Sequence, residues 1–159
     1  MQVFVSHSMK DVGLTGLVDR IARRLGITPF IAEHYLNVQG GITEKVESGI
    51  RGSDVALVLL TPAGFNSDFV QQEIAFAASL NKPKILLVQE GLEGQLSGWA
   101  YGHDFIPYDP FNPRPALNKI FSVLHALKQK KEKEQALAGF ILAGLGLWFL
   151  LSDGDEQQG

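Results

Sequence analysis

The chain has 159 residues, a formal net charge of −3 and no cysteine, and 19% of its residues are charged. This length suits one domain of ordinary size and excludes a second catalytic domain within it, while the slight acidity provides no basic field that would favour nucleic acid. Without cysteine, the sequence excludes a disulfide framework, a thiol nucleophile and a zinc site of the cysteine type.

No secretory signal is visible at the start of the sequence. Residues 3–5 already form a short apolar run, with no basic region before it and no small-residue cleavage site after it. We therefore expect the folded part of the chain to face the cytoplasm.

Up to about residue 130, short apolar runs alternate with amphipathic ones, a pattern typical of repeated βα units and a parallel sheet. Three runs are rich in Val, Ile and Leu throughout, as expected for central strands covered on both faces. Pro29 cannot donate a ladder hydrogen bond and favours an edge strand, and the last run is short enough for the opposite edge. In chain order, the predicted strands are residues 3–6, 28–32, 54–61, 84–89 and 105–108. The predicted fold is a flavodoxin-like α/β domain with a five-stranded parallel sheet in the order 2-1-3-4-5 and helices on both faces.

Four segments with helical spacing of apolar residues complete these units. The first has Asp11 available as its N-cap and Gly26 as its C-terminal stop. The other three are predicted to begin near Ile42, after Ser67 and near Ala116, and the last of them is expected to end near Lys128. We see no internal repeat.

The composition changes abruptly after the last of these helices. Residues 128–135 are charged or polar, residues 136–151 form the most hydrophobic stretch of the chain, and the remaining residues are acidic. We therefore predict a domain at 1–127, a charged linker at 128–135, a transmembrane helix at 136–152 and an acidic tail at 153–159.

The apolar run of about 16 residues would give roughly 24 Å of helix against a hydrocarbon core of about 30 Å, the short end of what can span. Lysines before it and acidic residues after it favour a single-pass membrane protein with the α/β domain in the cytoplasm. The small residues Gly139, Ala143 and Gly146 share a helical face and would let two such helices approach closely. The alternative is a helix that packs or oligomerises in a soluble assembly.

Ligands of doubly wound sheets bind beyond the carboxyl ends of the strands, where the strand order reverses. Residues 6–11, 33–41 and 61–69 follow the first three predicted strands and are rich in polar residues or glycine. Ser6 and Ser8 flank His7, but a hydrolase triad needs spatial neighbours and a nucleophile elbow, so we reject that interpretation. The four histidines are too widely spaced to favour a metal site.

Three motifs stand in order along the chain. The first is an apolar strand with Phe4 that ends in Ser6, His7 and Ser8, and the second runs from Phe30 to the glycines at 40 and 41. The third is residues 67–73, a serine and an aromatic residue followed by a glutamate. Together they resemble the boxes of a TIR (Toll/interleukin-1 receptor) domain of prokaryotic type over residues 1–127. The third motif has Phe69 and Val70 where the family carries Trp and Cys.

The resemblance implies an NAD+ glycohydrolase, which in some members also cyclises its product, activated by self-assembly in prokaryotic stress or antiviral defence. It makes Glu73 the catalytic residue, because a carboxylate beside the ribose would stabilise the oxocarbenium-like centre formed as nicotinamide leaves. NAD+ would be the substrate, and no cofactor is needed. The loop at 33–41 would cover the site and mediate self-association, and residues 136–151 would bind the membrane. The substrate-binding residues implied by the resemblance are Phe4, Ser6, His7, Ser8, Phe30, Glu33, Leu36, Gly40, Ser67 and Phe69.

Two other functions stay open at the level of the sequence. Many TIR domains only dock to other TIR domains, so this chain could be a non-enzymatic scaffold anchored to a membrane, and its glutamate a solvated helix residue. In a third interpretation the apolar tail is the effector, and assembly of the domain drives membrane disruption.

Overall fold

The computed structural model describes residues 1–32, 43–98 and 104–152, with side chains through residue 139. Its centre is a five-stranded sheet in the order β2-β1-β3-β4-β5, in which every neighbouring pair is parallel. The strands are β1 (Gln2–Ser6), β2 (Thr28–Ile31), β3 (Val55–Leu60), β4 (Lys84–Gln89) and β5 (Phe105–Tyr108). The predicted sheet and strand order are confirmed. Pro29 lies in β2 at the sheet edge, where its missing N–H costs no ladder hydrogen bond.

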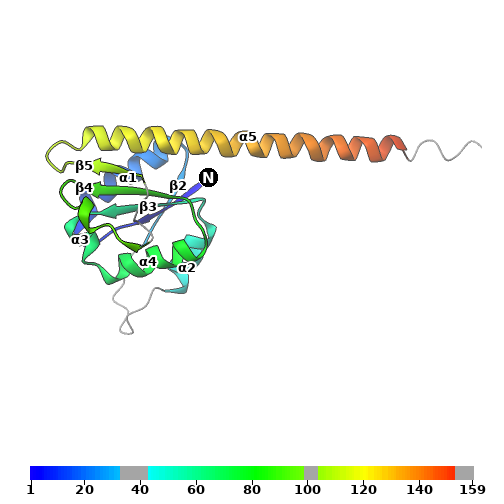
Figure 1. Cartoon of the computed structure of the whole chain (residues 1–159). Helices are drawn as coiled ribbons and strands as arrows, with labels where there is room; N and C mark the ends of the chain where they lie inside the picture. The colour runs from blue at the N-terminus through cyan, green and yellow to red at the C-terminus, as the bar shows by residue number, and fades with distance from the viewer. Residues whose placement is uncertain (33–42, 99–103, 153–159) are drawn as a thin grey trace, which may run out of the picture. The chain divides into compact units, whose positions relative to one another are not determined.

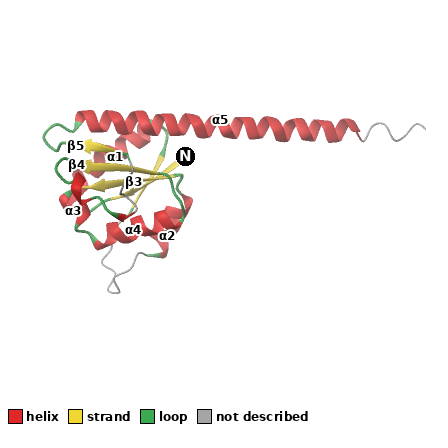
Figure 2. Cartoon of the chain, in the orientation of Figure 1, coloured by secondary structure: helices red, strands yellow, loops and turns green. Residues whose placement is uncertain are grey.

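Helices lie on both faces of this sheet, as predicted (Figures 1 and 2). Among the described residues they are α1 (Val12–Arg24), α2 (Glu44–Gly52), α3 (Pro62–Phe65), α4 (Asp68–Ser79) and α5 (Arg114–Ser152), with 3-10 turns η1 (Met9–Asp11) and η2 (Glu93–Gln95). α2 and α4 pack side by side on one face, and α1 lies beside the first turns of α5 on the other (Figure 1). The short α3 was not predicted, because four residues are too few to show a helical period.

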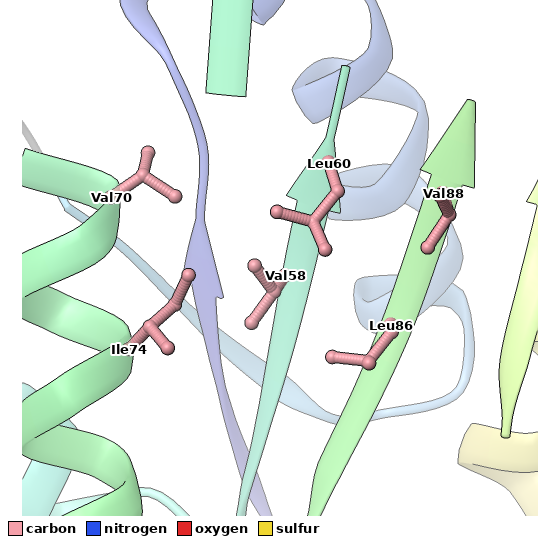
Figure 3. Packing of buried hydrophobic residues seen from close by; sticks show 6 residues of the cluster. All are labelled: Val58, Leu60, Val70, Ile74, Leu86 and Val88. Atoms are coloured by element: carbon pink, nitrogen blue, oxygen red, sulfur yellow. The ribbon is translucent and has the colours of Figure 1, made fainter. Parts of the chain in front are cut away.

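Figure 3 shows how the apolar pattern builds the core against α4. Alternate residues of β3 and β4 point to the same face of the sheet and meet helix residues spaced four apart. All six are at most 2% exposed, so each contributes roughly 1.5–3 kcal/mol through burial of its side chain. They are Val58 and Leu60, Leu86 and Val88, and Val70 and Ile74. This packing fixes α4 along the sheet and thereby positions every other side chain on that helix.

The last helix differs from the prediction. Instead of ending near Lys128, α5 continues without a break through the charged stretch to Ser152. The change of composition does not interrupt the helix, because Lys, Glu, Gln and Ala are all good helix formers. Residues 128–138 contain no Gly or Pro. Lys128 pairs with Glu132 at 3.5 Å and Lys130 with Glu134 at 3.9 Å, one turn apart, which adds weak support. The chain forms two compact units, residues 1–124 and 125–159.

The predicted transmembrane helix at 136–152 is not supported. No helix in the described part of the chain is long and apolar enough to cross a bilayer. The physical reason is the shortness of the apolar run, whose roughly 24 Å of helix falls below a hydrocarbon core of about 30 Å. The predicted acidic tail, residues 153–159, lies outside the described residues.

Candidate functional site

The strand order reverses between β1 and β3, so the turns that follow these two strands meet at the carboxyl edge of the sheet. Ser6 ends β1, and Ser6, His7 and Ser8 are all buried, at 0%, 5% and 8% exposure. These three predicted site residues therefore have little contact with solvent. They form the floor of the region where the two turns meet.

Glu73 is the central group of this region. Its side chain is 0% exposed, and the Ser6 hydroxyl donates a hydrogen bond of 2.6 Å to its Oε2 atom. Burial raises the pKa of Glu73 from 4.5 to about 8, although the Ser6 hydrogen bond lowers it in part. In this state the carboxyl group is mostly protonated at neutral pH.

The local sequence explains why a glutamate points inward here. Ser67 caps the start of α4, its hydroxyl accepting from the Val70 N–H at 3.4 Å. The residues buried along α4 are Val70, Glu73, Ile74 and Ala77, which follow the spacing of one helical stripe. Glu73 therefore occupies a position where the helix period calls for an apolar side chain, and the packing of its neighbours turns it toward the sheet.

A small polar network joins the two turns. Ser8 caps η1 in a capping box, in which its hydroxyl accepts from the Lys10 N–H at 3.3 Å and its own N–H donates to the Asp11 carboxylate at 3.3 Å. The Thr61 hydroxyl, at the end of β3, lies 3.0 Å from both carboxylate oxygens of Asp11. Asp11 precedes α1, as predicted, but its side chain makes no cap hydrogen bond to that helix. It holds the turn after β1 to the turn after β3 instead.

A cleft of about 600 Å³ opens beside this network, and we call it the first cleft. It lies within the common size range of ligand sites, roughly 300–1,000 Å³. Three predicted site residues line it: Ser8, Ser67 and Phe69. The remaining wall comes from Met9, Lys10, Pro62, Ala63 and Asn66. Glu73 is not a lining residue, since it lies buried one helical turn behind Phe69.

Other predicted residues have different surroundings. Phe4 is 1% exposed and belongs to a core cluster with Val46 and Ile50 of α2, against which Phe30 also packs. The rings of Phe4 and Phe30 stack with their centroids 6.1 Å apart. Both aromatic residues therefore belong to the core packing, and neither is among the residues that line the first cleft. Glu33, Leu36 and Gly40, with the whole predicted loop at 33–41, lie outside the described residues.

Lys10 and the α3 residues Pro62 and Ala63 line the first cleft. They lie within the predicted segments 6–11 and 61–69 but were not among the predicted substrate-binding residues. A signal for α3 exists in the sequence, because Thr61 followed by Pro62 is a typical N-cap and first helical residue. For Lys10 the sequence holds no signal beyond its closeness to the first motif. Within the described ranges, no group of three or more His, Asp or Glu side chains could hold a metal ion.

Comparison with known proteins gives two findings. The sequence model of the TIR domain matches residues 3–104, which is more than half of the chain. Among solved structures, the chain is similar to the Clostridium botulinum CMP N-glycosidase BcmB, with 17% sequence identity and a TM-score of 0.54. That similarity covers 76% of this chain and 98% of the other, and at this identity it is a likeness of fold. No curated protein matches the chain.

Proposed function

Because the chain belongs to the TIR domain family, we propose that it is an N-glycosidase that cleaves the bond between nicotinamide and ribose in NAD+, with Glu73 as its catalytic carboxylate. The observation that carries this proposal is the placement of Glu73. A fully buried glutamate, hydrogen-bonded to the last residue of β1 at 2.6 Å, stands at the point of the sheet where ligands of this fold bind. Strongly perturbed pKa values cluster at such sites.

Burial of this carboxyl group costs stability, so its presence calls for a functional reason. Hydrophobic neighbours on α4 surround the position, and an apolar side chain there would fill the same stripe without any desolvation penalty. The chain carries a glutamate instead. The name of the similar structure, an N-glycosidase acting on a nucleotide, supports the same reaction class for this chain.

The chemistry needs a negative charge next to the ribose. As the glycosidic bond breaks, its electron pair moves to the nicotinamide nitrogen, the ring becomes neutral, and positive charge develops on the ribose carbon before water adds. A carboxylate in a site of low dielectric constant stabilises that charge. The positive nicotinamide ring and the ribose hydroxyls would also favour the ionised form of Glu73, which lowers its pKa from about 8 when substrate binds.

Access to Glu73 requires a change from the described state, because the first cleft ends at Ser67 and Phe69 while Glu73 lies behind them. We propose that self-association of the domain, through a surface that includes the loop at 33–41, opens this path. Activity would then depend on protein concentration. Such gating suits a stress or antiviral defence signal in a prokaryote, with linear or cyclic ADP-ribose as the product.

The experiment is incubation of concentrated protein with NAD+ and identification of the products by mass spectrometry. We expect nicotinamide and ADP-ribose, or its cyclic form, from the wild type, and a rate that rises more than linearly with protein concentration. Glu73→Gln should remove the activity while preserving the shape of the side chain. Glu132→Gln, on an exposed position of α5, is the matched control and should leave it unchanged. Equal turnover by Glu73→Gln and the wild type would rule out the catalytic role.

One observation favours a second candidate function, a non-enzymatic module that docks to other TIR domains. Glu73 lines no part of the first cleft and is closed off by the packing of α4. The two functions differ in one result. A docking module would self-associate but would release no nicotinamide at any protein concentration.

A further inference from the structure

A second cleft, of about 370 Å³, lies next to the first at the carboxyl edge of the sheet. Its wall includes Asp11 from the turn after β1, Gln89 at the end of β4 and Tyr108 at the end of β5. Lys10, Pro62 and Ala63 line both clefts, so these three residues form a shared wall between them. Two neighbouring cavities with a common wall suit a ligand made of two parts.

Lys10 is the one cation among the described residues that line the two clefts. The residue is exposed, and its ammonium group forms no ion pair or hydrogen bond within the part of the chain that the structure describes. An exposed lysine beside a ligand cavity binds phosphate as a point charge. The centre of the shared wall is therefore the place where an anionic group would be stabilised.

Away from Lys10, the polar groups that line the second cleft are acidic or neutral. Its acidic group, Asp11, is held in place by Thr61 at 3.0 Å and by the Ser8 N–H at 3.3 Å, so its orientation is fixed by two different elements. Burial and the charges of Asp11 and Asp109 raise the pKa of the Tyr108 hydroxyl, so that the phenol stays neutral. A fixed carboxylate, an amide and a phenol suit the hydroxyls of a ribose and the edge of a flat ring, and the carboxylate would repel a phosphate.

We propose that the two clefts form one site for a dinucleotide, in which Lys10 binds the phosphates that join its halves. The nicotinamide riboside half lies in the first cleft, toward Phe69 and Glu73, and the second nucleoside lies in the second cleft against Asp11, Gln89 and Tyr108. This inference rests on the proposed function for the identity of the first half. It adds that the chain selects the phosphate-bearing dinucleotide over the corresponding nucleoside, and that Lys10 determines this specificity.

The test compares two substrates that share the scissile bond. NAD+ carries the phosphates, and nicotinamide riboside carries none. For NAD+, Lys10→Ala should raise KM about tenfold, the loss of one charged contact of roughly 1.4 kcal/mol, with kcat within twofold of the wild type. For the riboside, which has no phosphate for Lys10 to bind, the rise in KM should be much smaller than for NAD+. Lys10→Arg should restore most of the KM for NAD+, and Lys119→Ala, an exposed lysine on α5, is the matched control. An equal loss for both substrates, or no loss for either, would overturn the role of Lys10.

A binding measurement separates this inference from the proposed reaction. ADP-ribose, titrated calorimetrically into the full chain, needs no catalysis and should bind the wild type about tenfold more tightly than Lys10→Ala, and more weakly as salt is raised. Gln89→Ala should also weaken ADP-ribose binding, because it removes an amide from the cleft of the second nucleoside. If ADP-ribose binding depends on Lys10 and no nicotinamide is ever released, the dinucleotide site is supported and the proposed cleavage of NAD+ is refuted. If nicotinamide is released but the affinity for ADP-ribose is the same in the wild type, Lys10→Ala and Gln89→Ala, the proposal of a dinucleotide site is wrong.

Discussion

Replacement of Glu73 by Gln should change how the stability of the protein depends on pH. In the unfolded chain this carboxyl group loses its proton near its ordinary pKa of 4.5, whereas burial in the folded chain raises the pKa to about 8. The folded state therefore binds the proton more tightly. Its contribution to the free energy of unfolding is complete below about pH 4.5, falls as pH rises, and is lost above about pH 8.

The size of this effect follows from the two pKa values. A difference between about 8 and 4.5 corresponds to about 5 kcal/mol at roughly 1.4 kcal/mol per pH unit. Entry of water next to an ionised Glu73 reduces the loss, so we expect the wild type to lose about 3 to 5 kcal/mol between about pH 5 and about pH 9. Glutamine has the same shape and accepts from the Ser6 hydroxyl but does not ionise. The Glu73→Gln protein should therefore lack this part of the pH dependence and be the more stable protein above about pH 8.

The assay is urea unfolding followed by far-UV circular dichroism at a series of pH values, for the wild type, Glu73→Gln and Glu132→Gln. The difference between the wild type and Glu73→Gln isolates the titration of one group, because every other ionisable side chain is common to both. Replacement of Glu132, which is exposed and pairs with Lys128, should leave the wild-type curve unchanged. Parallel curves for the wild type and Glu73→Gln would refute the claim that the folded chain perturbs this carboxyl group.

Removal of the Ser6 hydroxyl by Ser6→Ala should destabilise the protein by about 1–3 kcal/mol and raise the pKa of Glu73 further, because that hydrogen bond lowers it. The pH at which stability is lost should therefore move upward, and an unchanged midpoint would contradict the geometry. Gly49→Ala should cost about 1–3 kcal/mol in urea unfolding, because a Cβ atom there would lie 2.2 Å from the ring of Phe30. Gly16→Ala, on α1 with nothing within 4 Å, is the matched control and should be neutral or slightly stabilising.

The sheet could be predicted because its signals are local. The apolar runs of the central strands and the proline of β2 each follow from burial or hydrogen bonding of single residues, and together they give one strand order. The end of the last helix could not be predicted from the change in composition. Charge in residues 128–135 changes the solvation of a helix but not its backbone preference, since Lys, Glu and Gln are good helix formers.

The candidate site, like the last helix, could be predicted only in part from the sequence. The resemblance to the family led to Glu73 as a carboxylate beside the ribose, but it did not predict the burial of that side chain. In the structure it shares the stripe of Val70, Ile74 and Ala77 and is fully buried. That stripe is readable from the sequence once a glutamate is allowed to occupy an apolar position. The role of Lys10 in the wall of two clefts depends on turns from distant parts of the chain, which no local pattern reveals.

The most direct measurement is the initial rate of nicotinamide release from NAD+ by concentrated wild-type protein and by Glu73→Gln at the same concentration. With Glu73 as the group that stabilises charge on the ribose, we expect release from the wild type and a rate for the variant lower by roughly 100-fold or more. Matching rates, or no release from either protein when both are folded and assembled, would contradict the assignment of Glu73 as a catalytic residue.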